Sequence, residues 1–325
     1  MKPHRREFLQ AAAAAGAFAF APRLATAQAY PAKPLRWIVG FPPGGGADII
    51  SRIMTPWLSE RLGQPVVVEN KPGASTNISI QTVINSPPDG YTLLFIAASA
   101  AVNATLFDKL PFSLVRDIAP VSGLIDFPLV LVANPSLPAK SVGELIVHAK
   151  ANPGKISLAS FGTGTTSHVA GELLKMMAGI EMVHVPYRGG APMIADLLAG
   201  QVQVGIDVMT TALPQIRSGA LNALAVGGKS RFPGLPEVPT IGETVAGYEA
   251  NSWCGVGVPK GTPDDIIERL NREINAGLAD PTLKARLANV ATTPIFFTPS
   301  EFGAYVAAEV DKWGKVVRTA GVKPE

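Results

Sequence analysis

Apolar runs of strand length alternate with helical patterns along most of this 325-residue chain. The first run, residues 35–40, is followed by apolar side chains at helical spacing over residues 49–57. Further strand-like runs occupy residues 65–69, 91–97, 155–160, 182–186, 203–208, 221–226 and 253–258. Because strands that alternate with helices are typical of α/β proteins, the chain is predicted to form mainly parallel sheets flanked by helices.

The turn after the first run, residues 41–48, reads FPPGGGAD. Three glycines let the backbone adopt positive φ and leave no Cβ to keep a ligand away. The amides of the first helical turn have no partner in the helix, so this turn can bind an anion. It is not a Walker A loop, because no Gly-Lys-Ser/Thr follows, and Ile49 replaces the third glycine of G-x-G-x-x-G. A turn that needs glycine only for its geometry is the alternative.

Other strand ends carry polar residues. Residues 160–168, SFGTGTTSH, repeat the order of strand, glycine turn and helix start, and the hydroxyl of Ser160 is among the added donors. Ser99 and Asn103 follow a strand, where ligands bind in open α/β sheets. Asp207 also ends a strand, and it either selects a polar or amino-bearing ligand or has a structural role.

Some signals predict local structure only. We expect two strands, residues 118–126 and 129–133, split by a Phe-Pro pair. Ser141 and Thr262 are predicted helix N-caps. The helical patterns in the last 60 or so residues are expected to pack back onto the first part of the chain.

Residues 1–29 have the features of an export signal. Arg5 and Arg6 are typical of the twin-arginine route. The apolar run that follows, residues 11–21, is shorter than the roughly 20 residues that a membrane span needs. Cleavage is expected after Ala29, with Ala27 as the alternative, which leaves a periplasmic protein.

The net charge excludes a nucleic-acid partner. The whole chain has a net charge of +3, and the first 29 residues carry four basic side chains and one acidic one. The remainder is therefore about neutral and has no basic stripe.

Residue patterns also argue against catalysis. The one cysteine, Cys254, lies in an apolar run and is predicted to be a buried structural thiol. Ser167 and His168 are adjacent on a helix, about 100° apart, and cannot pair as nucleophile and base. The histidines outside the signal show no metal-ligand spacing. We therefore expect no catalytic residues, no metal and no cofactor.

Five motifs occur in a fixed order after the signal, at residues 41–48, 88–93, 162–168, 185–189 and 253–255. Together they resemble the periplasmic solute receptors of tripartite tricarboxylate transporters, the Bug-type family, over essentially the whole mature chain. The resemblance implies a two-domain periplasmic-binding-protein-like fold of type II, with a ligand cleft between the domains. It also implies capture of a small carboxylate (a di- or tricarboxylate, an aromatic acid or an acidic amino acid), membrane permease subunits as partners, and a monomer. An exported sensor that feeds a signalling partner is the alternative, and a hydrolase is a weaker one.

The expected domains are residues 30–127 with 253–325, and residues 128–252. The chain would then cross between them near residues 127–128 and 249–253. The resemblance implies that two glycine loops hold the ligand. It assigns ligand contacts to Phe41, Gly45, Gly46, Ala47, Asp48, Thr163, Gly164, Thr165, Ser167 and Tyr187. Asp48 is expected to accept bonds from loop amides or to bind a ligand amine or hydroxyl, with helix capping as the alternative.

Overall fold

The structure is a computed structural model that describes residues 30–107 and 109–323. The predicted export signal, with its twin arginines and cleavage site, lies outside the described residues. By their contacts, residues 1–32 and 33–325 form separate units, and the helices and strands below all belong to the second. No helix among the described residues is long and apolar enough to cross a membrane.

The strands of the second unit form one mixed sheet, in the order β2-β1-β3-β9-β4-β7-β5-β6. The first strands pair in parallel, β1 with β2 and β3, whereas β9 runs antiparallel to β3 and β4. The strands of this half are β1 (Leu35–Val39), β2 (Val66–Asn70), β3 (Thr92–Ala97), β4 (Ile118–Ala133) and β9 (Asn251–Pro259). The predicted parallel arrangement is therefore correct for β1, β2 and β3, but the late strand β9 inserts antiparallel beside them.

The other half of the sheet repeats this arrangement. Strand β5 pairs in parallel with β6 and β7, and β4 pairs antiparallel with β7 and β8. Its strands are β5 (Ser157–Ser160), β6 (Val183–Pro186), β7 (Val204–Val208) and β8 (Asn222–Val226), and a short β10 (Thr293–Pro294) pairs with β4.

Strand β4 joins the two halves. The expectation of two strands split by a Phe-Pro pair was wrong, because residues 118–133 form one continuous strand. Pairing with β9 ends at Pro128, opposite Asn251, and pairing with β7 begins at Leu129. The proline therefore lies where the strand changes partner, and its missing N–H disturbs the ladder little there.

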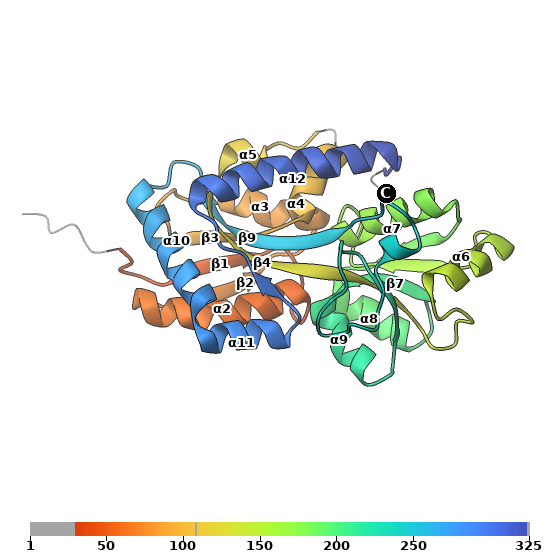
Figure 1. Ribbon diagram of the computed structural model, residues 1–325. Coiled ribbons are helices and arrows are strands. Elements are labelled where there is room, and N and C mark those ends of the chain that lie inside the picture. The colour runs from red at the N-terminus through yellow and green to blue at the C-terminus, as the bar shows by residue number, and fades with distance from the viewer. Residues whose placement is uncertain (1–29, 108, 324–325) are drawn as a thin grey trace, which may run out of the picture. The chain divides into compact units, whose positions relative to one another are not determined.

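Two layers of helices cover the N-terminal half of the sheet (Figure 1). Helix α12 lies over α4 and α5, and α10 and α11 contact α2 on the other side. These helices are α2 (Gly46–Leu62), α3 (Asn77–Ile84), α4 (Ser99–Leu106), α5 (Leu114–Asp117), α10 (Asp264–Ala279), α11 (Pro281–Asn289) and α12 (Pro299–Thr319). The expectation that the C-terminal helices return to the first part of the chain is confirmed.

The other half is flanked by α6 (Val142–Ala151), α7 (Thr166–Ala178), α8 (Gly190–Leu198) and α9 (Met209–Arg217), and two 3₁₀ turns, η1 (Ala74–Thr76) and η2 (Ile241–Glu243), complete the elements named here. Ser141 caps α6 as predicted, since its hydroxyl accepts a hydrogen bond from the Glu144 amide. The predicted cap at Thr262 was wrong. Its hydroxyl donates to the carbonyl of Pro259 (2.8 Å), and Pro263 precedes the first residue of α10.

The C-terminal helix is fixed to the sheet by a buried polar contact. The indole N–H groups of Trp253 and Trp313 both donate to Glu309, at 2.8 and 2.9 Å. Next to Trp253, Cys254 is fully buried, as predicted, and burial raises the pKa of its thiol. A protonated thiol without access to solvent is a packing element rather than a nucleophile.

Candidate functional site

A cleft of about 620 Å³, part of it open to solvent, lies among the N-terminal ends of several helices. Its walls come from both halves of the sheet, chiefly from the starts of α2 and α8 and from strands β3 and β7. The lining residues are Phe41, Pro42, Pro43, Gly45, Gly46, Ala47, Ile50, Phe95, Ala97, Ser99, Phe127, Phe161, Thr166, Gly189, Gly190, Ala191, Pro192, Asp207, Val208, Thr210 and Ser252.

Helix α2 presents free backbone amides to this cleft. It begins at Gly46, after Gly45, and no side chain caps it. The first amide that bonds back is that of Ile49, which donates to the Gly45 carbonyl (3.0 Å). The amides before it have no partner within the helix, and the helix dipole adds partial positive charge. Gly46 and Ala47 line the cleft at this point, so the turn can bind an anion.

The loop before α2 is held in place by Asp48, whose side chain is buried. Its carboxylate accepts hydrogen bonds from the Gly44 amide (3.0 Å), from Arg52 (2.9 Å) and from Asn70 (3.1 Å). Burial by itself would raise the pKa of Asp48, but these bonds outweigh it and hold the pKa below its usual range. Acceptance from a loop amide is one of the roles expected for Asp48, and it keeps the glycine turn rigid.

Helix α8 faces α2 across the cleft. It begins at Gly190 after Gly189, whose φ is +115°, and no side chain caps it either. A Cβ built on Gly189 would lie 3.1 Å from Cδ of Pro42, and one on Gly44 would lie 4.0 Å from Cβ of Ala191. Two uncapped helix starts therefore meet at van der Waals distance, and both line the cleft.

Two buried hydroxyls also lie on the cleft wall. Thr210 and Ser99 are 5% and 2% exposed, and neither hydroxyl bonds to another group in the part of the chain that the structure describes. Thr210 is close to the start of α2, since a Cβ built on Gly46 would lie 3.8 Å from its Cβ and 2.8 Å from Cγ2 of Val208. An anion at the α2 amides can therefore also accept a hydrogen bond from Thr210.

Asp207 lies behind the start of α8 and is fully buried. One carboxylate oxygen accepts from the Val208 amide (2.8 Å), and the other accepts from the Thr211 hydroxyl (2.5 Å). A Cβ on Gly190 would lie 3.2 Å from this carboxylate. Burial raises the pKa of Asp207 to about 6, although both hydrogen bonds oppose the shift. An acidic group of the protein therefore lies just before α9, whose first turn has no side-chain cap.

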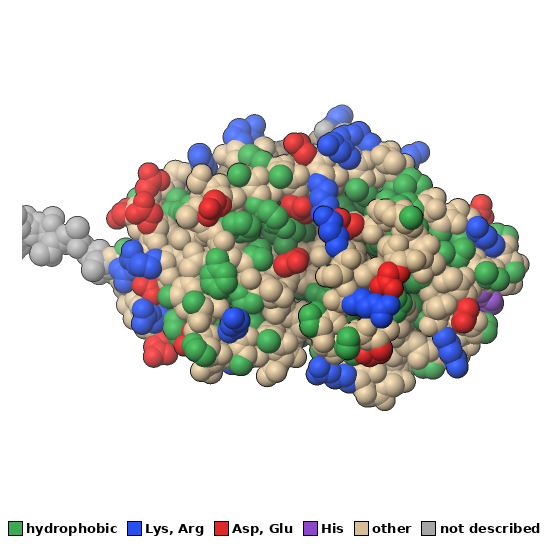
Figure 2. Space-filling model, viewed as in Figure 1, with side chains coloured by type: hydrophobic (Ala, Val, Ile, Leu, Met, Phe, Trp, Pro, Cys, Tyr) green, Lys and Arg blue, Asp and Glu red, His purple; other side chains and the backbone are tan. Residues whose placement is uncertain are grey.

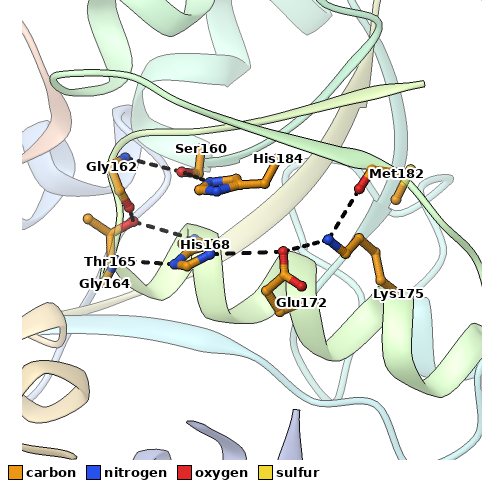
Figure 3. Close-up of polar contacts among 9 residues, drawn as sticks. All are labelled: Ser160, Gly162, Gly164, Thr165, His168, Glu172, Lys175, Met182 and His184. Carbon is orange, nitrogen blue, oxygen red and sulfur yellow. Dashed lines mark hydrogen bonds and ion pairs between the residues drawn. The ribbon is translucent and has the colours of Figure 1, made fainter. Parts of the chain in front are cut away.

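The second glycine loop, residues 160–168, bonds mainly to itself (Figure 3). The Gly162 amide donates to the Ser160 hydroxyl (3.2 Å), and the Gly164 amide donates to Nδ1 of His168 (3.2 Å). The Thr165 hydroxyl donates to the Gly162 carbonyl (2.6 Å) and accepts from the His168 amide (3.4 Å), which caps α7. These bonds occupy donors that the sequence suggested for a ligand.

Beneath this loop the rings of His168 and His184 stack, with centroids 4.0 Å apart and planes 16° apart (Figure 3). With Glu172 they bring three possible metal-ligand atoms within 4.8 Å of one another. Stacked imidazoles direct their lone pairs along parallel planes, which does not let both reach one ion, and the Lys175 ammonium is 2.7 Å from Glu172. Burial, with His184 and Lys175 nearby, lowers the pKa of His168 to about 3. The arrangement fits two packed rings better than a metal centre.

The second glycine loop contacts the N-terminal half through a strained segment. Three consecutive residues without a glycine have left-handed backbone, with φ of +44° at Ala74, +51° at Ser75 and +77° at Thr76. The Ser75 hydroxyl donates to the Thr163 carbonyl, and the Ser75 carbonyl accepts from Asn103 (2.5 Å). A Cβ on Gly164 would lie 2.8 Å from Oδ1 of Asn103. This contact joins the two halves at a place apart from the cleft lining.

The predicted ligand residues therefore fall into two groups. Those that line the cleft are Phe41, Gly45, Gly46, Ala47, Ser99 and Asp207. Those placed elsewhere are Asp48, Asn103, Ser160, Thr163, Gly164, Thr165, Ser167 and Tyr187. Within the second group, the Ser167 hydroxyl donates to the Ile206 carbonyl (2.5 Å) and the Tyr187 hydroxyl donates to Asp196 (2.8 Å). The part that each residue plays in binding stays a prediction.

Sequence reasoning found the helix that opens at Gly190 but did not assign its start to the site. It also did not assign the Thr210 hydroxyl or most of the phenylalanines in the lining. The glycine pair at residues 189–190 follows a strand and opens a helix, so the rule used for residues 41–48 could have assigned this helix start to the site. The phenylalanines gave no such signal, because an apolar side chain in a strand pattern reads the same whether it faces a core or a cleft.

The comparisons with known proteins show the family of this chain. Residues 50–322 match the family described as "Tripartite tricarboxylate transporter family receptor". The chain belongs to this family. Among its relatives, protein BugT of Bordetella pertussis is 40% identical over 303 residues, which cover 92% of each chain. The UPF0065 protein in the tcbD-tcbE intergenic region of Pseudomonas sp. strain P51 is 38% identical, over 89% of this chain and 87% of the relative.

Solved structures of such receptors share the fold. Rpa4515 of R. palustris with adipate is 34% identical, with a TM-score of 0.88 over 91% of this chain and 100% of that one. MatC of Rhodopseudomonas palustris with bound malate is 28% identical, with a TM-score of 0.84 over 89% and 100%. The receptor thus has the two-domain α/β fold of periplasmic binding proteins, as predicted. Members of the family are periplasmic solute-binding receptors and not enzymes.

Proposed function

We propose that this receptor captures a small carboxylate in the cleft and presents it to the membrane subunits of a tripartite tricarboxylate transporter. The observation that carries the proposal is the meeting of the uncapped starts of α2 and α8 in one cleft. A carboxylate that enters a cleft loses water and needs fixed donors in its place. Backbone amides at helix starts supply such donors without a side-chain charge.

The charges around the cleft support binding by amides. The residues that line it include no Lys, Arg or His. Basic and acidic side chains are interspersed over the face shown in Figure 2. Arg188, the cation that the sequence places nearest a glycine turn, is exposed and is not part of the lining. Recognition of the anion therefore rests on the helix starts and on neutral hydroxyls.

The proposal includes closure of two domains around the ligand, residues 30–127 with 253–325 and residues 128–252. Strand β4 changes partner between Pro128 and Leu129, and β9 pairs with it as far as Asn251. A hinge there would let a bound ligand hold the two helix starts together. Scattering with and without ligand would measure the closure, and an unchanged radius of gyration at saturation would count against it.

We also propose export as a monomer, with the signal removed after Ala29. The mass of the periplasmic protein would place the cleavage site. A mass that retains residues 1–29 would contradict signal removal, and a dimer mass in native conditions would contradict the monomer.

The main test is calorimetry of the purified protein against di- and tricarboxylates, aromatic acids and acidic amino acids, with neutral sugars as controls. At least one acid should bind reversibly and without turnover, and the sugars should not bind. A receptor that ignores every acid but binds a sugar would refute carboxylate capture.

A further inference from the structure

Phenylalanines from four separate elements form the walls of the cleft. They are Phe41 in the loop after β1, Phe95 on β3, Phe127 on β4 and Phe161 in the loop after β5. The rings of Phe41 and Phe161 approach edge to face, with centroids 6.2 Å apart and planes at 77°. An aromatic ligand body placed among such rings would gain both buried apolar area and favourable ring geometry.

Helix starts at the cleft supply backbone donors for a carboxylate. Of the helix starts that line it, α7 is capped by Thr165, whereas α4 and α9 have no side-chain cap. The carboxylate of Asp207, which accepts from the Val208 amide just before α9, disfavours an anion at that helix start whenever it is ionised. The uncapped starts of α2 and α8 converge on one region, beside the Thr210 hydroxyl. The Ser99 hydroxyl and the bonded pair of Thr166 and Ser252 are neutral groups.

A second carboxylate would be disfavoured in this cleft. It would lose its water among phenylalanine rings, and the lining offers it no cation. Asp207 would add like-charge repulsion whenever it is ionised, because its carboxylate lies behind Gly190. A neutral hydroxyl or carbonyl on the ligand could instead bond to the buried hydroxyls.

We propose that the ligand is an aromatic monocarboxylate, with its carboxylate at the starts of α2 and α8 and its ring among the phenylalanines. This inference rests on the proposed function, because it assigns a ligand class to the same cleft. It departs from a polycarboxylate ligand, whose second carboxylate would find no cation in the lining and would lie among phenylalanine rings.

Calorimetric titration of the purified protein with benzoate, benzamide, hexanoate, adipate and citrate tests the assignment. Benzoate should bind at least about tenfold more tightly than each other compound, because only it combines one charge with a ring. Tighter binding of adipate or citrate would overturn the inference and leave carboxylate capture intact. Hexanoate equal to benzoate would overturn the aromatic part, and benzamide equal to benzoate would overturn the role of the charge. Binding of none of the acids would instead reject the proposed function for this panel together with the inference.

A pair of matched variants locates the ring. Phe161→Leu keeps an apolar side chain in the cleft but removes the aromatic face, whereas Phe296→Leu makes the same change at an exposed position outside the lining. Benzoate affinity should fall about fivefold in the first and stay unchanged in the second. Hexanoate affinity should change little in either. An equal loss for benzoate and hexanoate in Phe161→Leu, or no loss for benzoate, would contradict the assignment of this ring.

Discussion

The two glycine loops of this receptor look alike in sequence but differ in what they leave available. The loop before α2 holds its shape through Asp48 and leaves the first helical turn uncapped. The loop before α7 bonds to its own hydroxyls and to His168, and Thr165 caps its helix. Glycine permits close approach in both, but only amides without a protein partner can bind a ligand. We therefore expect the first loop to bind the ligand and the second to contribute to stability.

The largest expected effect is on binding at the first loop. Gly46→Val would place a side chain between the α2 amides and Thr210, where even a Cβ would lie 2.8 Å from Cγ2 of Val208. We expect the affinity for carboxylate to fall about 100-fold, or roughly 3 kcal/mol, with the fold retained. Calorimetry with circular dichroism would measure both.

The matched control for this change is Gly143→Val. Gly143 is also in the first turn of a helix, and the nearest atom to a Cβ there is the hydroxyl of Ser141 at 3.9 Å. Full affinity in Gly46→Val would exclude the α2 start from the site. A similar loss in Gly143→Val would show that valine acts through the fold instead.

The second loop should respond through stability. Gly164 has a φ of +74°, and a Cβ on it would lie 2.8 Å from both Asn103 and Leu106. Gly164→Ala should lower the free energy of unfolding by about 3 kcal/mol, from left-handed strain and from overlap. Urea denaturation would measure it.

Gly179→Ala separates these two causes. Gly179 has a similar φ, +61°, and no atom within 4 Å of its Cβ position. The free energy of unfolding should therefore fall by only about 1 kcal/mol in Gly179→Ala, from the strain of a left-handed backbone alone. Equal losses in the two variants would mean that the contact with Asn103 and Leu106 contributes nothing.

Local patterns were enough to predict the parallel strands and most helices. They could not predict the antiparallel insertion of β9, because Cys254 and its neighbours form an apolar run whatever their direction. Nor could they show that Pro128 lies inside a strand, since its tolerance depends on a change of pairing partner. The periodicity of apolar residues shows which side of an element is buried. It carries no information about which distant strands pair.

For the site, sequence could identify glycine turns but not which amides stay free. The Thr165 hydroxyl was predicted to contact a ligand, and the His168 imidazole was given no part in binding. In the structure both instead accept hydrogen bonds from amides of the loop itself. Capping by a side chain three residues before an amide can be read from sequence. Contact of Gly189 with Pro42 cannot, because it requires the fold of both halves.

The smallest expected effect is on the pH dependence of ligand affinity. It concerns the α8 side of the cleft, where the carboxylate of Asp207 lies behind the helix start. Asp207 has a pKa of about 6 because it is buried, and it lies behind the start of α8. A bound carboxylate nearby disfavours the ionised form, so binding should raise this pKa further and take up protons near neutral pH. If the rise is about one unit, affinity should increase about fourfold between pH 7.5 and 6. Titration calorimetry in buffers of different ionisation enthalpy would measure the proton uptake.

Asp207→Asn, whose amide can still bond to Val208 and Thr211, should remove most of that pH dependence. A slope that persists in Asp207→Asn would assign the titration to another group, and affinity that rises with pH in the unmodified receptor would contradict a ligand carboxylate beside Asp207.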